Sequence, residues 1–281
     1  MARRSGQQRS KVRRRVSKKN PKLQIDKYQL YTLAVQSPET DVDFLKTTYR
    51  QLRGRSAEIL REDFCGTFRL SHEWVKNRPK HKAWAVDYDP EPLEYGRRHY
   101  LERLPAPTQK RLQISESNVL TSKLPEADIV VALNFSYFVF KQRQRLKTYF
   151  ENVLKSLKKN GLFVMDVFGG TQCTDAIEDQ QKLKGFTYYW DQENFDPVTN
   201  QAVFHIHFKP AGRKKIENVF TYDWRMWTIP ELREILEEVG FSKTHVYWEG
   251  TNRNGEGDGK FTRTEQGEAC LSWIAYIVAE K

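Results

Sequence analysis

The segment ILREDFCGTF, residues 59–68, decides the fold of this 281-residue chain. A predicted strand, AEILRED (57–63), ends here in two carboxylates, and Gly66 then lets the backbone pass close to a ligand. A predicted helix, TFRLSHEWVKN (67–77), begins immediately afterwards. A strand that turns directly into a helix is typical of doubly wound sheets, which bind ligands outside the carboxyl ends of their strands. We therefore expect a ligand site at this turn.

Short apolar runs and amphipathic stretches alternate beyond this turn, which predicts successive βα units and a mostly parallel sheet. HKAWAVDYD (81–89) is the second predicted strand, and a helix opens at Pro90. The remaining core elements are strands at 111–119, 127–134 and 161–168, with a long helix over 141–160 that Gly161 ends.

The periodicity changes to two after residue 170, which indicates antiparallel strands. GFTYYWDQ (185–192), QAVFHIHF (201–208) and ENVFTYDW (217–224) predict a three-stranded insertion. A helix at 230–241, a strand at 244–250, a flexible hairpin loop at 250–260 and a strand at 270–280 are expected to follow.

These elements predict five parts of the chain: a disordered basic tail (1–25), N-terminal helices (26–56), a ligand-binding core (57–170), an antiparallel β insertion that covers the substrate (171–225), and a C-terminal helix and strands that complete the core sheet (226–281). Residues 1–22 carry ten Lys or Arg and no acidic residue. The rest of the chain has 37 basic and 36 acidic residues, so attraction to RNA or another polyanion is expected mainly in the tail.

The composition excludes several classes of protein. The three cysteines lie far apart in the sequence, so neither a disulfide framework nor a zinc module is expected. His205 and His207 would share one face of a strand, but no third ligand accompanies them, so we expect no metal. No apolar run approaches the ~20 residues of a membrane span, and no secretory signal is visible. We expect a cytoplasmic protein without a membrane partner, or a nuclear one if the source is eukaryotic.

Asp87 is the second informative residue of the core. It lies 21 residues beyond Gly66, close to the offset of about 20 residues at which an acidic residue meets a ribose in nucleotide-binding βαβ units. A carboxylate accepts hydrogen bonds from both ribose hydroxyls and disfavours a 2′-phosphate. The alternative is that Asp87 caps the helix that opens at Pro90.

These two segments and the order of elements resemble class I S-adenosylmethionine-dependent methyltransferases. The resemblance covers roughly residues 45–170 and 226–281. It implies an α/β, Rossmann-like, doubly wound sheet of seven strands with an antiparallel last strand, here with a small antiparallel β insertion. The first turn of that family reads acid, x, Gly, x, Gly, x, Gly. Here these positions hold Glu62, Phe64, Gly66 and Phe68, so two glycines are missing, and Asp63 is the acid if the register shifts by one.

The resemblance implies S-adenosyl-L-methionine as the cofactor, with Asn118 contacting the adenine amino group and Cys65 packing beside the cofactor. The full set of expected cofactor-binding residues is Glu62, Asp63, Phe64, Cys65, Gly66, Thr67, Asp87, Tyr88, Asn118, Val119, Asn134 and Phe135. Asn134-Phe135-Ser136-Tyr137 stands where DNA-base amine methyltransferases carry Asn-Pro-Pro-Tyr, and the missing prolines argue against base methylation.

The residues expected at the substrate are Tyr137, Trp190, Tyr222, Trp224 and Arg225. Trp190, Tyr222, Trp224 and Trp227 form either a cage for a cationic or aromatic acceptor or ordinary sheet packing. A sulfonium is already an excellent leaving group, so alignment supplies much of the rate and a catalytic base is not required. If the acceptor must lose a proton, Tyr137 or a histidine is the candidate base.

Three functions follow for comparison with the structure. The first is methyl transfer to a small-molecule or protein acceptor. The second is RNA methylation that uses the basic tail to hold the substrate. The third is a non-catalytic, Rossmann-like binding module that lost its cofactor together with its glycines.

Overall fold

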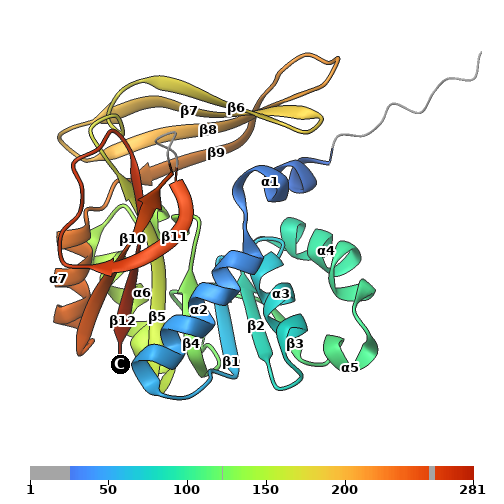
Figure 1. Ribbon diagram of the computed structural model, residues 1–281, viewed down its shortest axis with the longest axis vertical. Helices are drawn as coiled ribbons and strands as arrows, with labels where there is room; N and C mark the ends of the chain where they lie inside the picture. The colour runs from blue at the N-terminus through green and yellow to red at the C-terminus, as the bar shows by residue number, and fades with distance from the viewer. Residues whose placement is uncertain (1–25, 122, 253–256) are drawn as a thin grey trace, which may run out of the picture.

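The computed structural model describes residues 26–121, 123–252 and 257–281, and the predicted basic tail lies outside them. An eight-stranded sheet forms the centre, in the order β11-β10-β12-β5-β4-β1-β2-β3 (Figure 1). Its strands are β1 (Ile59–Asp63), β2 (Lys82–Asp87), β3 (Leu112–Glu116), β4 (Ala127–Ala132), β5 (Leu157–Gly169), β10 (Lys243–Thr251), β11 (Gly257–Thr264) and β12 (Trp273–Glu280).

The strand directions confirm the predicted fold class. Strands β3, β2, β1, β4 and β5 pair in parallel, whereas β12 is antiparallel to both β5 and β10. Strand β11 is an additional edge strand, and its first half, residues 257–260, lies in the region 250–260 that the sequence predicts to be a loop. Its glycine-rich start hides the alternation, and Phe261 is its only aromatic residue.

Helices cover both faces of the central sheet, as a doubly wound fold requires. One face packs against α2 (Pro38–Arg53), α3 (Arg69–Asn77) and α4 (Pro90–His99), and the other packs against α6 (Arg143–Ser156) and α7 (Ile229–Val239). Short helical turns complete the connections, namely η1 (Leu101–Arg103), α5 (Ala106–Gln109) and η2 (Ser136–Val139). Helix α6 ends four residues before the predicted end at residue 160, because Leu157 pairs with Ala127 and begins β5.

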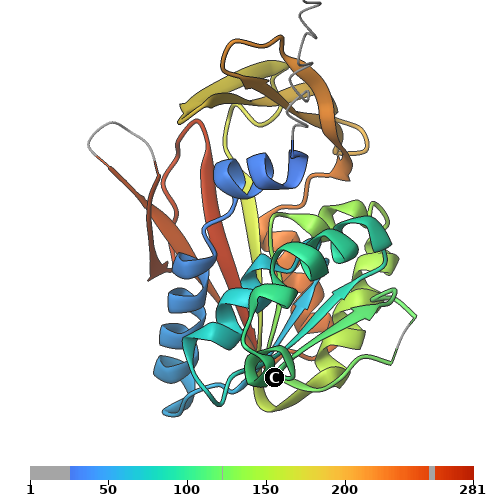
Figure 2. The ribbon, with the colours of Figure 1, turned by 90° about the vertical axis from the view of Figure 1, so that its right-hand side faces the viewer.

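The insertion forms a separate antiparallel sheet of β6 (Ile177–Leu183), β7 (Phe186–Asp196), β8 (Gln201–Pro210) and β9 (Ile216–Arg225). It has four strands where three are predicted, because the edge strand β6 is almost entirely polar and shows no apolar alternation. Helix α1 (Lys27–Val35) lies between this sheet and the core (Figures 1 and 2). It contacts both, through an ion pair of Lys27 with Glu91 and a ring contact of Tyr31 with Phe220.

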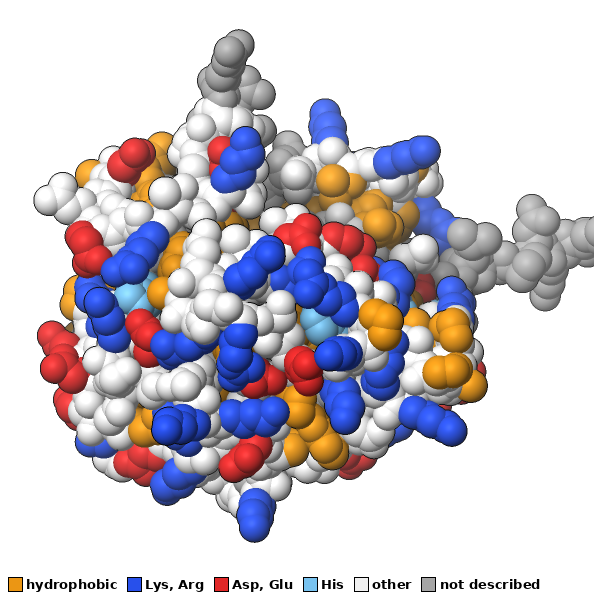
Figure 3. Space-filling view, turned by 60° about the horizontal axis from the view of Figure 1, so that its bottom comes forward, with side chains coloured by type: hydrophobic (Ala, Val, Ile, Leu, Met, Phe, Trp, Pro, Cys, Tyr) orange, Lys and Arg blue, Asp and Glu red, His pale blue; other side chains and the backbone are white. Residues whose placement is uncertain are grey.

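The charge on the surface and the length of the helices are relevant to two expectations, namely binding of a polyanion and the absence of a membrane partner. On the face that Figure 3 shows, Lys and Arg side chains are spread widely with Asp and Glu side chains between them. In the described part of the chain, no helix has both the length and the apolar character that a membrane crossing requires.

A fully buried ion pair ties β1 to α6. The Arg61 guanidinium donates to both carboxylate oxygens of Asp63, at 2.9 and 3.1 Å, and to Ser156 Oγ at 2.6 Å. Tyr149 also donates its hydroxyl to Asp63, at 3.0 Å. These partners hold the Asp63 side chain inside the protein, on the side of the sheet that α6 covers.

We expect Asp63→Ala to lower the free energy of unfolding by about 3–5 kcal/mol, because it leaves the Arg61 charge buried without its partner. The double variant R61M/D63L removes both charges and should recover most of that loss. Urea unfolding of the two variants measures the difference. Equal destabilisation in both would show that the charge pair is not the cause.

Candidate functional site

The turn after β1 has three left-handed backbone positions, and only one of them is a glycine. Phe64, Gly66 and Phe68 all have a positive φ, at 57°, 52° and 51°. These are the three positions that align with the glycines of the family's motif. A left-handed conformation costs a non-glycine residue on the order of 1–2 kcal/mol. The surrounding packing must therefore stabilise both phenylalanines.

Each phenylalanine is held by specific neighbours. The Phe64 ring lies 5.7 Å from the Phe140 ring and 5.4 Å from the Tyr149 ring. Phe68 is fully buried against α4, where a Cβ on Gly96 would lie only 2.3 Å from its ring. Gly96 therefore provides the space for Phe68 from a neighbouring helix. The sequence signal for this role is a single glycine inside a predicted helix, which the sequence analysis did not use.

Asp87 at the end of β2 holds this turn. Its Oδ2 accepts from the Gly66 backbone N–H at 2.8 Å, and its Oδ1 accepts from the Asp89 N–H at 3.0 Å. The N-cap of α4 is Asp89, whose side chain accepts from Glu91 N, so Asp87 does not have that role. The structure thus brings together the two residues, Gly66 and Asp87, that the 21-residue spacing connects. Tyr88 beside them is 70% exposed.

Glu62 is buried beside the same turn. Its Oε2 accepts from the Ser71 N–H in the first turn of α3 at 2.8 Å. Burial raises the pKa of Glu62 to about 7. Asp63, the alternative acid, does not reach this place, because its side chain is occupied by Arg61 and Tyr149.

Two further carboxylates reach the site, and the sequence analysis missed both. Asp166 in β5 accepts from the backbone N–H groups of Asn134 and Phe135, at 2.7 and 2.9 Å, and burial raises its pKa to about 7. Asp41 in α2 accepts from the Tyr276 hydroxyl at 2.6 Å, and burial raises its pKa to about 6. A lone acid inside the apolar run FVMDVF was the available signal for Asp166. Only the tertiary fold brings Asp41 to this place.

A cavity of about 690 Å³ opens beside these carboxylates. Its walls are the carboxyl ends of β4 and β5, the start of β12, parts of β10 and β11, α1 with the α1–α2 connection, and the inner face of the insertion sheet. Five of the predicted site residues line it: Asn134, Phe135, Trp190, Tyr222 and Trp224. The cavity therefore lies between the core and the insertion that was expected to cover the substrate.

Two predicted substrate residues do not reach the cavity. Tyr137 is fully buried, and its hydroxyl donates to the Asp166 backbone carbonyl at 2.7 Å, so it cannot contact an acceptor in this structure. Arg225 donates to Glu231 and lies 3.9 Å from the centre of the Trp227 ring. Trp227 therefore pairs with an arginine of the chain and is no part of a cage.

The other predicted cofactor residues differ in exposure. Cys65, Thr67 and Val119 are buried, and burial raises the pKa of the Cys65 thiol well above its usual value. Asn118 is exposed after β3, and its Oδ1 accepts from Leu120 N at 2.9 Å. This hydrogen bond uses the amide oxygen of Asn118 and leaves its role toward a cofactor a prediction.

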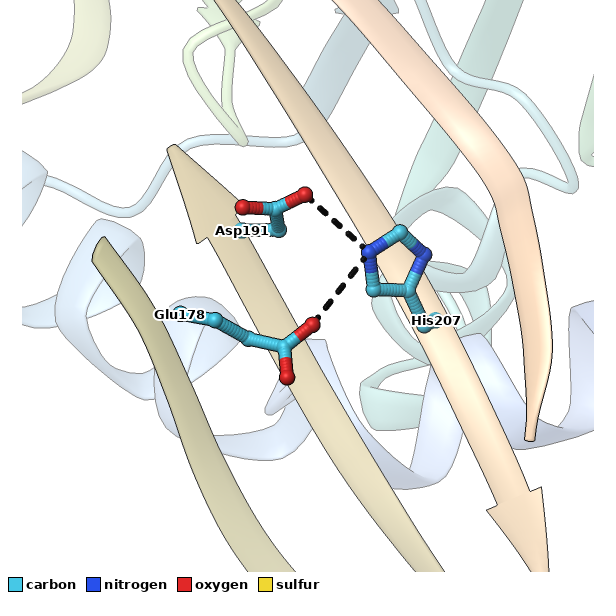
Figure 4. Close-up of side chains that lie close together, drawn as sticks. All are labelled: Glu178, Asp191 and His207. Atoms are coloured by element: carbon cyan, nitrogen blue, oxygen red, sulfur yellow. Dashed lines mark hydrogen bonds and ion pairs between the residues drawn. The ribbon is translucent and has the colours of Figure 1, made fainter. Parts of the chain in front are cut away.

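A histidine with two acids lies on the outer face of the insertion sheet (Figure 4). His207 Nε2 is 3.2 Å from Asp191 and 3.5 Å from Glu178. However, His207 Nδ1 lies 2.8 Å from the Asn218 N–H and must accept from it, which places the ring proton on Nε2. A metal would need the lone pair of Nε2, so this group fits a hydrogen-bond network better than a metal site. His205 pairs separately with Glu193 and Thr221.

Comparison with known proteins agrees with this geometry at the level of the fold. No family model and no curated protein matches the sequence. Among solved structures, the chain resembles an S-adenosylmethionine-dependent methyltransferase from Clostridium acetobutylicum, at 15% identity over 90% of this chain and 96% of that one, with a TM-score of 0.66. It also resembles an amino pentose methyltransferase from Micromonospora echinaspora, at 15% identity over 93% and 99% of the two chains, with a TM-score of 0.64.

A third structure, the sugar N-methyltransferase from Streptoalloteichus sp ATCC 53650, is 14% identical over 100% of this chain and 98% of that one, with a TM-score of 0.60. The chain therefore has the class I methyltransferase fold, as the sequence resemblance predicts. The identities are low, so these likenesses define the fold and leave the activity to be tested.

The buried carboxylates predict a pH dependence of stability. Glu62 and Asp166 have pKa values of about 7 in the folded protein, against about 4 for unfolded chains, so both groups take up protons on folding. Their contribution is fully present below the unfolded pKa and is lost as the pH rises through about 7. We expect the ligand-free protein to lose stability between about pH 4 and about pH 7, and Glu62→Gln to reduce that loss by on the order of 1–3 kcal/mol.

Urea unfolding across this pH range is the measurement. Glu94→Gln, which changes a carboxylate on the exposed face of α4, should keep the wild-type profile. If Glu62→Gln also keeps that profile, then Glu62 does not carry the shifted pKa.

Proposed function

We propose that this protein is an S-adenosylmethionine-dependent methyltransferase that acts on a small molecule. The observation that carries the proposal is the hydrogen-bonded pair of Gly66 and Asp87 at the ends of β1 and β2, in the same sheet whose β4 and β5 ends line a cavity of about 690 Å³. Small-molecule sites typically occupy 300–1,000 Å³ and lie at the carboxyl ends of such sheets. We therefore propose that the cofactor binds at the strand ends and that the acceptor binds in the cavity.

The residues at the strand ends suit the parts of S-adenosylmethionine. The Asp87 carboxylate would accept from the ribose hydroxyls, since each of its oxygens retains a lone pair beyond its backbone hydrogen bond. Tyr88 offers an exposed ring, and Asn118 offers an amide, to the adenine. The Glu62 and Asp166 carboxylates would attract the ammonium and sulfonium charges of the methionine part.

The chain's own residues would act mainly by orientation. When bound, S-adenosylmethionine supplies a methyl group on a sulfonium, which leaves as a neutral thioether. Alignment of the reacting atoms is worth about 7–11 kcal/mol in well-oriented systems. The Asp166 carboxylate fixes the loop after β4 through two backbone N–H groups, and α1 with the insertion sheet walls the cavity and would limit water.

A small-molecule acceptor fits better than the alternatives. Two of the similar structures are named as an amino pentose and a sugar N-methyltransferase. The RNA alternative depends on the basic tail, which lies outside the described residues, and no comparison supports it. We propose that residues 171–225 form the substrate cover, because the inner face of their sheet lines the cavity. Binding of S-adenosylhomocysteine separates the enzyme from a non-catalytic module, which need not bind it.

Asp87→Asn tests the proposed cofactor site. The variant keeps an oxygen that can accept from Gly66 N but loses the charge, so we expect S-adenosylmethionine affinity to fall at least about tenfold. The matched control is Asp89→Asn, which makes the same change two residues away and retains a good N-cap for α4. Titration calorimetry on both variants and the wild type gives the affinities.

Unchanged affinity in Asp87→Asn would overturn the assignment of Asp87. Absence of any binding to the wild-type protein would overturn the proposed function itself. Circular dichroism of each variant checks that the fold is intact.

A further inference from the structure

The charged side chains that line the cavity are all acidic. Four acidic residues line it: Asp41, Asp166, Asp179 and Glu249. Among the described residues that line it, there is no lysine and no arginine. The chain beyond residue 22 has 37 basic and 36 acidic residues, so this charge is specific to the cavity and does not reflect the composition. An anionic acceptor would meet repulsion here and find no partner for its charge.

Three of these acids surround one tyrosine from three different elements. The Tyr276 hydroxyl of β12 donates to Asp41 of α2, and the negative charges of Asp41, Asp166 and Glu249 all raise the pKa of Tyr276, after burial itself. Glu249 of β10 accepts from the Gly259 N–H at 3.1 Å. Asp41, Asp166 and Glu249 therefore form one wall of the cavity, on the side of the core sheet.

Aromatic rings form the wall that belongs to the insertion sheet. Tyr222 stacks on Trp224 with ring centres 4.4 Å apart, and Trp190 lies 6.2 Å from Tyr222 and 6.4 Å from Trp224. All three line the cavity. Ring faces attract cations when water is excluded, and carboxylates do so more strongly. A cation in this cavity would thus have favourable partners on both sides.

The geometry points to an amine as the acceptor, bound as an ammonium between the acid wall around Tyr276 and the rings of Trp190, Tyr222 and Trp224. This inference rests on the proposed methyltransferase function and narrows its substrate class. It excludes acceptors that carry phosphate or carboxylate near the reacting atom. Asp41 is the residue assigned to the ammonium, because it lines the cavity and belongs to neither the first turn nor the strand ends that hold the cofactor.

The reaction balances with the groups present. The ammonium first gives one proton to a cavity carboxylate, which later releases it to solvent. The freed nitrogen lone pair then forms a bond to the methyl carbon while the carbon–sulfur bond breaks, and that electron pair stays on sulfur. The products are a methylated ammonium, S-adenosylhomocysteine and one proton. A carboxylate whose pKa burial has raised toward neutrality is a suitable proton acceptor.

Three probes of similar size that share a phenyl ring and differ in charge test the inference, namely benzylamine, benzyl alcohol and benzoate. Each is titrated at millimolar concentration into the full chain saturated with S-adenosylhomocysteine. Tryptophan fluorescence reports binding, because Trp190, Trp224, Trp248 and Trp273 all line the cavity. We expect benzylamine to bind at least about tenfold more tightly than benzyl alcohol, and benzoate to bind more weakly than either.

Asp41→Asn should reduce the preference for benzylamine over benzyl alcohol at least about fivefold. Asp43→Asn, on the exposed side of the same helix, should leave the preference unchanged. Equal or tighter binding of the alcohol or the benzoate would overturn the inference, as would the absence of any benzylamine response. Calorimetry with S-adenosylhomocysteine on the same samples distinguishes a failure of the amine assignment from a failure of the proposed methyltransferase function. If that ligand binds and the charge preference is absent, only the amine assignment fails.

Discussion

The hydrogen bond between the Gly66 N–H and the Asp87 carboxylate is the interaction on which the proposed site depends. It joins the turn after β1 to the end of β2, and so fixes the edge of the sheet where a nucleoside would bind. The turn itself is strained, because phenylalanines occupy two of its three left-handed positions. Packing on Gly96, Phe140 and Tyr149 compensates for that strain. The turn therefore holds its left-handed backbone at Phe64 and Phe68 through side-chain packing, without a glycine at either position.

Burial of several carboxylates at one place is the second constraint. Glu62, Asp41 and Asp166 lie on different elements and all have raised pKa values, with burial as the largest cause. Such groups destabilise a ligand-free fold at neutral pH, since their charged forms lose hydration and, within the described part of the chain, form no ion pair with an arginine or lysine. A cationic ligand would recover that energy. Asp63 shows the contrast, because this carboxylate, one position after Glu62, has Arg61 as its partner and stabilises the core.

Much of the fold could be predicted from the sequence, because apolar periodicity and the Gly66–Asp87 spacing are local signals. The predictions failed where the signal was weak or distant. The edge strands β6 and β11 bury little and therefore show no alternation. Asp41 is brought to the cavity only by the packing of α2, and Tyr137 is removed from it by its hydrogen bond to the Asp166 carbonyl. The sequence spacing predicts that Gly66 and Asp87 lie close together. Which other residues reach the site depends on the direction of their side chains, which spacing does not give.

The most direct test of the account is a crystal structure of the protein with S-adenosylhomocysteine. The account predicts that both ribose hydroxyls donate to the Asp87 carboxylate, and that the sulfur lies at the mouth of the cavity beside Asp166. A nucleoside bound away from the ends of β1 and β2, or a sulfur directed away from the cavity, would contradict it.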